Sequence, residues 1–134
     1  MIPIGEGEKP KAKNWNRQEL KEFFDPVRAW QRTNKIASKQ IYVAEFGVFR
    51  QAPGADKYIA DLIDIFNDER WHWGFYSFRE DAWPGMDYEI GTRNLSAAYW
   101  ESVEKGEHPS RVPFYKSNPI FSAILKGIEK VGSR

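Results

Sequence analysis

Stretches with helical periodicity alternate along this chain with short stretches that are almost wholly apolar. The first helical stretch follows Asn16, the expected N-cap, because Glu19 occupies the capping-box position. Pro26 interrupts the pattern, so the helix either kinks there or restarts with Asp25 as cap and Pro26 as first helical residue. The apolar positions expected on one face are Leu20, Phe23, Phe24, Val27 and Trp30.

Two apolar stretches predict a pair of parallel strands. Residues 41–49 are β-rich and nearly all apolar, as expected of a strand buried on both faces of a parallel sheet, and Glu45 is the exception. Residues 71–78 form a second, aromatic strand. The helical pattern between them makes a right-handed crossover of ordinary length. The side chains expected in the core of this region are Tyr58, Ile59, Leu62, Ile63, Phe66, Trp71, Trp73 and Phe75.

The C-terminal third combines turn-forming residues with one further amphipathic helix. Residues 79–113 are rich in turn-formers and predict long loops, with a short helix near residues 95–100. Asn118 and Pro119 form a cap and first-turn pair for the last helix, which ends at Gly132. Its expected inward positions are Ile120, Phe121, Ile124, Leu125, Ile128 and Val131.

Length and charge narrow the class of protein. Residues 1–14 lack apolar periodicity and predict an exposed lead-in, so 15–134 form the one expected domain. Twenty basic and nineteen acidic residues give a net charge of +1 with no long block of either sign, so we expect no nucleic-acid partner. No apolar stretch approaches the ~20 residues of a membrane span, so we expect no membrane partner.

The chain also contains no cysteine, which excludes disulfides, thiolate metal sites and cysteine nucleophiles. His72 and His108 lack paired ligand spacing, so we expect no metal site and no cofactor. Six Trp, six Tyr and nine Phe are a heavy aromatic load, which suits either a core or flat platforms for sugar rings.

Glu45 is the sharpest chemical signal in the sequence. A carboxylate at the C-terminal end of a buried parallel strand is costly unless it is paired or used in chemistry. In a βα barrel that end of the strand faces the active site. A rim residue held in a structural salt bridge is the alternative, and position alone leaves both interpretations open.

Residues 41–47 read IYVAEFG, and residues 73–89 read WGFYSFREDAWPGMDYE. These segments resemble the seventh and eighth strands of glycoside hydrolase family 5, the cellulase-like retaining glycosidases, and the likeness extends over roughly residues 15 to 131. The resemblance implies that Glu45 of the Glu-Phe-Gly motif is the nucleophile. Ala44 stands where glycine is often found, a change that leaves the carboxylate in place.

A retaining glycosidase also needs a second carboxyl group about 5 to 5.5 Å away that protonates the leaving oxygen. In the family this acid/base glutamate lies in an Asn-Glu-Pro motif after the fourth strand, and no Asn-Glu pair occurs in this sequence. Glu80 and Asp87 match no acid/base motif. We therefore expect a chain that carries the nucleophile without its acid partner.

The same resemblance implies a sugar-binding platform after the second strand. Tyr76 or Phe78 occupies the region of the family's platform aromatic, and Trp83 lies further into the loop. The apolar C–H face of a pyranose suits an aromatic plane. Arg79 is expected to bond either sugar hydroxyls or Glu45, or to form an exposed ion pair.

The expected fold is therefore α/β: the C-terminal segment of a partial TIM (β/α)8 barrel, with two parallel strands and about three helices. The chain has 134 residues, about half of the ~250 that a closed barrel usually takes, so barrel edges and apolar faces are expected to need covering. A missing barrel portion or self-association would cover them.

Three functions follow from this sequence. The first is a fragment of an endoglucanase-like retaining glycoside hydrolase acting on a polysaccharide such as β-glucan or cellulose, inactive alone. The second is a carbohydrate-binding module that uses the aromatic loop. The third is an assembly module that uses the exposed edges. The sequence indicates no compartment, although a parent enzyme of this kind would be compatible with secretion or the periplasm.

Overall fold

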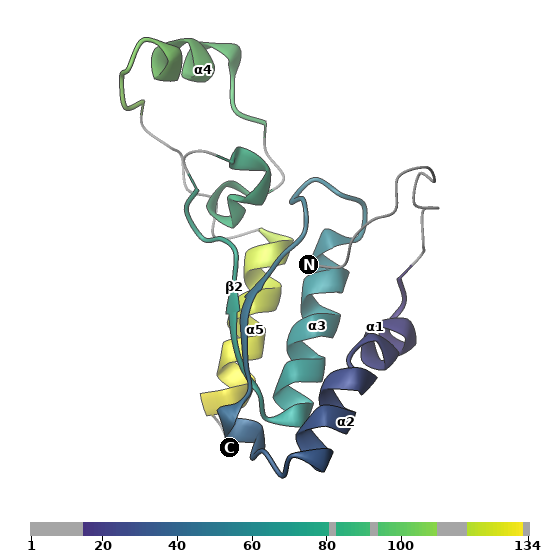
Figure 1. Ribbon diagram of the computed structural model, residues 1–134. Coiled ribbons are helices and arrows are strands. Elements are labelled where there is room, and N and C mark those ends of the chain that lie inside the picture. The colour runs from purple at the N-terminus through teal and green to yellow at the C-terminus, as the bar shows by residue number, and fades with distance from the viewer. Residues whose placement is uncertain (1–14, 81–82, 92–93, 110–117, 133–134) are drawn as a thin grey trace, which may run out of the picture.

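The computed structural model describes residues 15–80, 83–91, 94–109 and 118–132, so the predicted lead-in at 1–14 lies outside the described residues. Helices and strands follow one another in a βα arrangement (Figure 1). In chain order the elements are α1 (Arg17–Phe23), α2 (Asp25–Thr33), the 3₁₀ helix η1 (Ser38–Gln40), β1 (Tyr42–Phe46), α3 (Ala55–Glu69), β2 (His72–Phe75), the 3₁₀ helices η2 (Pro84–Met86) and η3 (Tyr88–Ile90), α4 (Ala97–Glu104) and α5 (Pro119–Gly132).

The two strands form a parallel sheet, as predicted, but each is shorter than its apolar stretch. Tyr42 pairs with His72 and Val43 with Trp73, and the register then shifts, so that Phe46 pairs with Phe75. Between the last two pairs β1 therefore contains one residue more than β2. Such a bulge interrupts the alternation of side chains and re-aims the residues within it.

Helices α3 and α5 pack against each other and against one face of the sheet (Figure 1). Ile59 and Ile63 of α3 meet Ile120 and Ile124 of α5, and all four are almost fully buried. The two helices approach closely at Gly127, where an added Cβ would lie 2.2 Å from Cγ2 of Ile63. The helical periodicity around Ile59 is thus confirmed, because this face supplies the core.

A second cluster joins the N-terminal helices to the end of α3. Phe66 is completely buried, with its ring 5.2 Å from those of both Phe24 and Phe46 and 6.3 Å from that of Trp71. Leu20 completes the cluster from α1. The aromatic load of the chain therefore serves the core here, as expected for Trp71.

Local signals in the N-terminal segment are confirmed. The side chain of Asn16 accepts from the backbone N–H of Glu19 at 3.0 Å, and the Glu19 carboxylate accepts from the backbone N–H of Asn16 at 3.1 Å. The helix restarts rather than kinks, and Asp25 is already the first residue of α2 because Phe24 occupies the cap position.

Helix α4, in the C-terminal third, begins after its cap Ser96 and extends to Glu104, four residues beyond the predicted end.

Several predicted burials are wrong. The stretch at 41–49 was expected to be buried on both faces, but helices cover one face only, and Tyr42 is 63% exposed. With two strands, the opposite face has no second layer in the described residues. Five side chains that helical periodicity placed inward are also exposed: Phe23, Trp30, Leu125, Ile128 and Val131.

The described residues therefore form a mixed α/β unit with a parallel sheet and a single helix layer. We call the uncovered side of the sheet the open face; it carries Tyr42, Ala44, Glu45 and His72, all exposed. The assignment to a (β/α)8 barrel stays a prediction.

Candidate functional site

Glu45 lies at the C-terminal end of β1, inside the irregular part of the strand. Regular alternation would give Glu45 and Val43 the same face, and Val43 packs against the core. The bulge exposes both Ala44 and Glu45 and returns Phe46 to the helix side. The expectation of a buried carboxylate is thus wrong for this structure, and Glu45 pays no desolvation cost here.

Glu45 forms no hydrogen bond or ion pair with any residue that the structure describes. The alternative of a structural salt bridge therefore finds no partner in this part of the chain. The charge of Glu45 contributes to raising the pKa of Tyr76, as the smallest of its causes. Glu45 is thus an unengaged carboxylate in the electrostatic range of an aromatic hydroxyl.

The glycine of the Glu-Phe-Gly motif has a packing reason. A Cβ on Gly47 would lie 2.4 Å from the carbonyl oxygen of Tyr76 and 2.8 Å from the hydroxyl of Tyr88. The backbone after β2 thus passes directly over the chain that leaves β1. Parallel pairing brings Glu45 and Tyr76 to the same end of the sheet, and Gly47 allows the close approach of the two chains there.

Tyr76 follows β2 and is anchored to β1, since its N–H donates to the carbonyl of Phe46 at 2.9 Å. The Tyr76–Ser77 peptide bond is cis. Its hydroxyl donates to Oε2 of Glu80, while the backbone N–H of Trp83 donates to Oε1 of the same carboxylate at 3.2 Å. The pKa of Tyr76 is raised above its ordinary value, first by this hydrogen bond to Glu80, then by burial and by the charges of Glu80 and Glu45.

The other predicted sugar-binding residues are placed differently. Trp83 is 58% exposed, whereas the Phe78 ring packs 5.4 Å from that of Phe121 at the start of α5. Arg79 donates from Nε and Nη2 to the two oxygens of the fully buried Glu89, at 2.8 and 2.5 Å. Of the three alternatives predicted for Arg79, the structure therefore shows an ion pair and no contact with Glu45. A sugar contact by Arg79 stays a prediction.

Buried charged and polar groups hold the loop that carries these residues. Arg50 donates from Nε to the carbonyl of Pro84 and from Nη1 to that of Gly91, both at 2.7 Å. Burial lowers the pKa of Arg50, and the nearby carboxylate of Asp87 opposes this effect. The hydroxyl of Tyr88 accepts from the N–H of Val48 and donates to its carbonyl. The segment at 84–91 is therefore a fixed scaffold rather than a loose loop.

The carboxylates near β2 consequently fall into two groups. Asp87 and Glu89 are almost fully buried and engaged with arginines or backbone. Glu80 holds Tyr76 and Trp83, which leaves Glu45 as the exposed carboxylate that these contacts do not engage. The arrangement can supply a nucleophile or a general base, but a second carboxyl at the spacing for glycoside cleavage is not evident among these groups.

Sequence reasoning missed three features of this region. Tyr42 was expected in a buried strand, yet it lies on the open face with its hydroxyl beside Gly74. Phe49 is 50% exposed and covers Gly85, close to Trp83. The role of Glu80 as a bridge was also missed. Gly74 and Gly85 were the only signals for the first two contacts, because each marks a place where another side chain lies against the backbone. The Glu80 contacts had no such signal.

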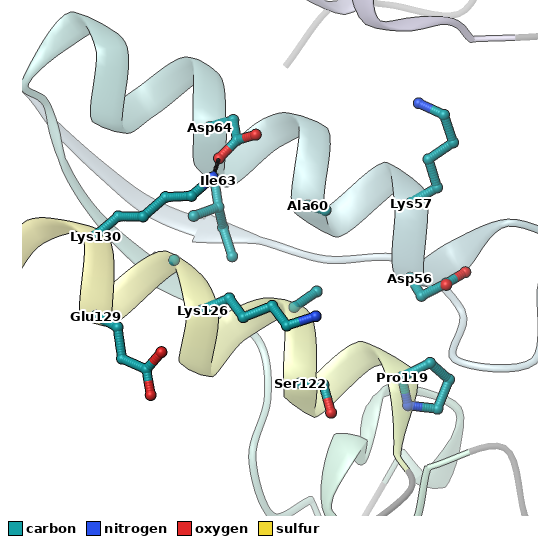
Figure 2. Close-up of a pocket in the computed structure, with 12 residues that line it drawn as sticks. Asp56, Lys57, Ala60, Ile63, Asp64, Pro119, Ser122, Lys126, Glu129 and Lys130 are labelled. Carbon is teal, nitrogen blue, oxygen red and sulfur yellow. Dashed lines mark hydrogen bonds and ion pairs between the residues drawn. The ribbon is translucent and has the colours of Figure 1, made fainter.

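A separate groove of about 590 Å³ lies between α3 and α5, away from the open face. Figure 2 shows Ile63 between the helices, with Lys130 reaching Asp64 across the groove; their Nζ–Oδ1 distance is 2.7 Å. Both basic and acidic side chains border this groove. The groove is a surface feature of the helix layer and takes no part in the arrangement around Glu45.

Fold and site together define a parallel α/β unit with a carboxylate and aromatic residues at the C-terminal ends of its strands. No protein-family model and no curated protein matches this sequence. Within the described residues, no cluster of three or more acidic or histidine side chains is arranged to hold a metal ion. No helix in those residues has the length and apolar character needed to cross a membrane.

Proposed function

We propose that this chain supplies the nucleophile and part of the sugar-binding surface of a retaining glycoside hydrolase whose remaining barrel strands come from elsewhere. The observation that carries the proposal is Glu45: an exposed carboxylate at the C-terminal end of a parallel strand, unengaged in the described residues. A carboxylate without a structural partner is free to react.

In this proposal an oxygen of Glu45 attacks the anomeric carbon of a β-linked glucan and forms the glycosyl-enzyme bond. The leaving oxygen takes its proton from an acid about 5 to 5.5 Å away, and water then releases the sugar. That acid has to come from the completing portion, because Glu80 is held by Tyr76 and Trp83. The exposed ring of Trp83 offers a sugar-stacking surface.

The open face and the edge of β2 that faces away from β1, which pairs with no other strand among the described residues, support the need for completion. His72 and Tyr76 donate to β1, to the carbonyls of Ile41 and Phe46. Because backbone groups alternate sides along a strand, those of Trp73 and Phe75 face the other edge. A groove of about 680 Å³ runs along this edge between β2 and the end of α5, with Ile128 and Val131 in its lining. An added apolar strand would pair there and fill it.

The test is reconstitution. The chain is mixed with a separately expressed N-terminal portion of a family 5 endoglucanase that contains the first six strands, and release of reducing sugar from β-glucan is measured. Wild type is expected to restore hydrolysis. Glu45→Gln keeps the side-chain shape but removes the anion, so turnover should collapse while sugar binding persists. A folded complex without hydrolysis, or full activity in Glu45→Gln, would contradict the proposal.

A carbohydrate-binding module without turnover is the second candidate, favoured by the missing acid partner and the exposed Trp83. Calorimetric titration of the isolated chain with cello-oligosaccharides tests it. Binding lost in Trp83→Ala and Tyr76→Ala but kept in Glu45→Gln would support the module. A folded chain that binds no oligosaccharide would exclude it.

Assembly with further copies is the third candidate, and the same edge of β2, unpaired among the described residues, favours it. Sedimentation analysis of the chain should then show oligomers that Val131→Lys disrupts, because Val131 lines the edge groove. Leu125→Lys is the matched control: Leu125 is also exposed on α5 but does not line that groove. A strictly monomeric wild type would remove this candidate.

A further inference from the structure

One carboxylate touches two of the residues predicted to bind sugar. Glu80 accepts from the Tyr76 hydroxyl through Oε2 and from the Trp83 backbone N–H through Oε1. The two partners lie on either side of Glu80 in the sequence, four residues before it and three after it. Tyr76 is itself fixed to β1 through the carbonyl of Phe46. The contacts therefore connect the strand that carries Glu45 to the segment that carries Trp83.

We propose that Glu80 is a positioning residue that holds Tyr76 and Trp83 in one arrangement beside Glu45. This inference rests on the proposed function for its purpose, because it concerns the sugar-binding surface of that site. The contacts on which it is based involve only residues of this chain.

Energetics favour positioning over stability as the role of these contacts. Trp83 is 58% exposed and Tyr76 is half-buried, so both groups have water as an alternative partner. Hydrogen bonds that compete with water add little net stability. What they do remove is conformational freedom of the Tyr76 side chain and of the backbone that carries Trp83. A platform residue whose backbone is already held loses less entropy when a ligand stacks on it.

The charges around the hydroxyl keep this connection intact. Donation to Glu80 raises the pKa of Tyr76, and burial and the charges of Glu80 and Glu45 raise it further. The neutral phenol is the form that donates. The hydroxyl therefore stays a donor at neutral pH, and alkaline pH that ionises Tyr76 should break the connection, because the phenolate cannot donate and repels Glu80.

The experiment uses the full chain labelled with 5-fluorotryptophan, and ¹⁹F NMR follows the resonance of Trp83, assigned with Trp83→Phe. At pH 7, Tyr76→Phe removes only the hydroxyl and should shift this resonance in the wild-type background. The same substitution should leave the resonance unmoved in Glu80→Ala, because the connecting carboxylate is gone. Glu80→Gln keeps an acceptor and should retain part of the response. Glu104→Ala, an exposed acidic residue at the end of α4, is the control and should behave as wild type.

A second measurement titrates Tyr76 itself, by NMR of ring-labelled tyrosine. Its pKa should fall in Glu80→Ala, and fall less in Glu45→Gln, because Glu80 supplies the hydrogen bond as well as a charge. A merely structural contact between Glu80 and the Trp83 backbone would leave this pKa unchanged. The inference is overturned if Tyr76→Phe still shifts the Trp83 resonance in the Glu80→Ala background. It is also overturned if the pKa of Tyr76 is the same in Glu80→Ala as in the wild type. No sugar and no partner chain is needed, so this result is separate from that of the hydrolysis test.

Discussion

The two faces of the β1–β2 sheet come from the same two short strands but differ in burial. On the helix side, Phe46 and Trp73 pack against α3, and side chains such as Phe66 have no exposed surface. On the open face, Tyr42 and Glu45 are exposed. The exposure of Glu45 comes from the bulge in β1, because regular alternation would have placed it on the same side as Val43. Substitutions on the two faces should therefore have different consequences for stability.

Phe66→Ala should have the largest effect on folding. The ring touches three aromatic partners in a dry cluster, so its loss should lower the free energy of unfolding by about 3–5 kcal/mol. Tyr42→Ala, an aromatic truncation on the open face, should cost far less because the side chain is 63% exposed. Urea denaturation of both variants measures the contrast, and equal losses would show that the open face is covered in solution.

Gly127→Ala should have an intermediate effect on the helix layer. The new methyl would lie 2.2 Å from a buried atom of Ile63, and relieving that overlap should cost about 1–3 kcal/mol. Gly132→Ala is the matched change on the same helix, since nothing lies within 4 Å of its added Cβ. Thermal melts should place Gly127→Ala well below wild type and Gly132→Ala near it. A tolerated Gly127→Ala would mean that α3 and α5 pack less closely.

Glu45→Gln should have the smallest effect on the stability of the chain. Glu45 is exposed and unengaged in the described residues, so the change should stay within about 0.5 kcal/mol. A structural ion pair with a buried cation would instead be destabilised by about 3 to 5 kcal/mol. Thermal melts of the two proteins distinguish these cases. A large loss would restore the ion-pair interpretation and weaken the proposed catalytic role.

Elements with local signals could be predicted from the sequence. The capping box at Asn16 and Glu19 was confirmed because both partners lie within one turn of helix. The Asn118–Pro119 pair likewise starts α5, where Asn118 accepts from the N–H of Phe121 at 3.1 Å. Parallel pairing of the two strands followed from the helix between them. These features depend on neighbours in the chain, which the sequence displays directly.

The candidate site was predictable in its residue types and not in its contacts. Glu45 could be singled out as a carboxylate in an apolar stretch, but the bulge that exposes it depends on pairing with β2. Arg79 and Glu89 both carry charges that suggest exposure, yet Glu89 is fully buried, and Arg79 donates to both of its carboxylate oxygens. Ion pairs and register shifts depend on which residues are close in space, and the spacing of residues along the sequence does not reveal this.

The sequence by itself determined the order of the main helices and the two strands, which face of α3 forms a core, and that a carboxylate lies near the C-terminal end of the first strand. Those properties arise from local hydrogen bonding and from the period of apolar side chains. Only the tertiary structure decided that one face of the sheet has no covering layer among the described residues, that Gly47 lets the chain after β2 pass close to the chain leaving β1, and that Glu80 joins Tyr76 to Trp83. The physical reason is that exposure and hydrogen-bond partners depend on which segments meet, and that is set by packing of the whole chain.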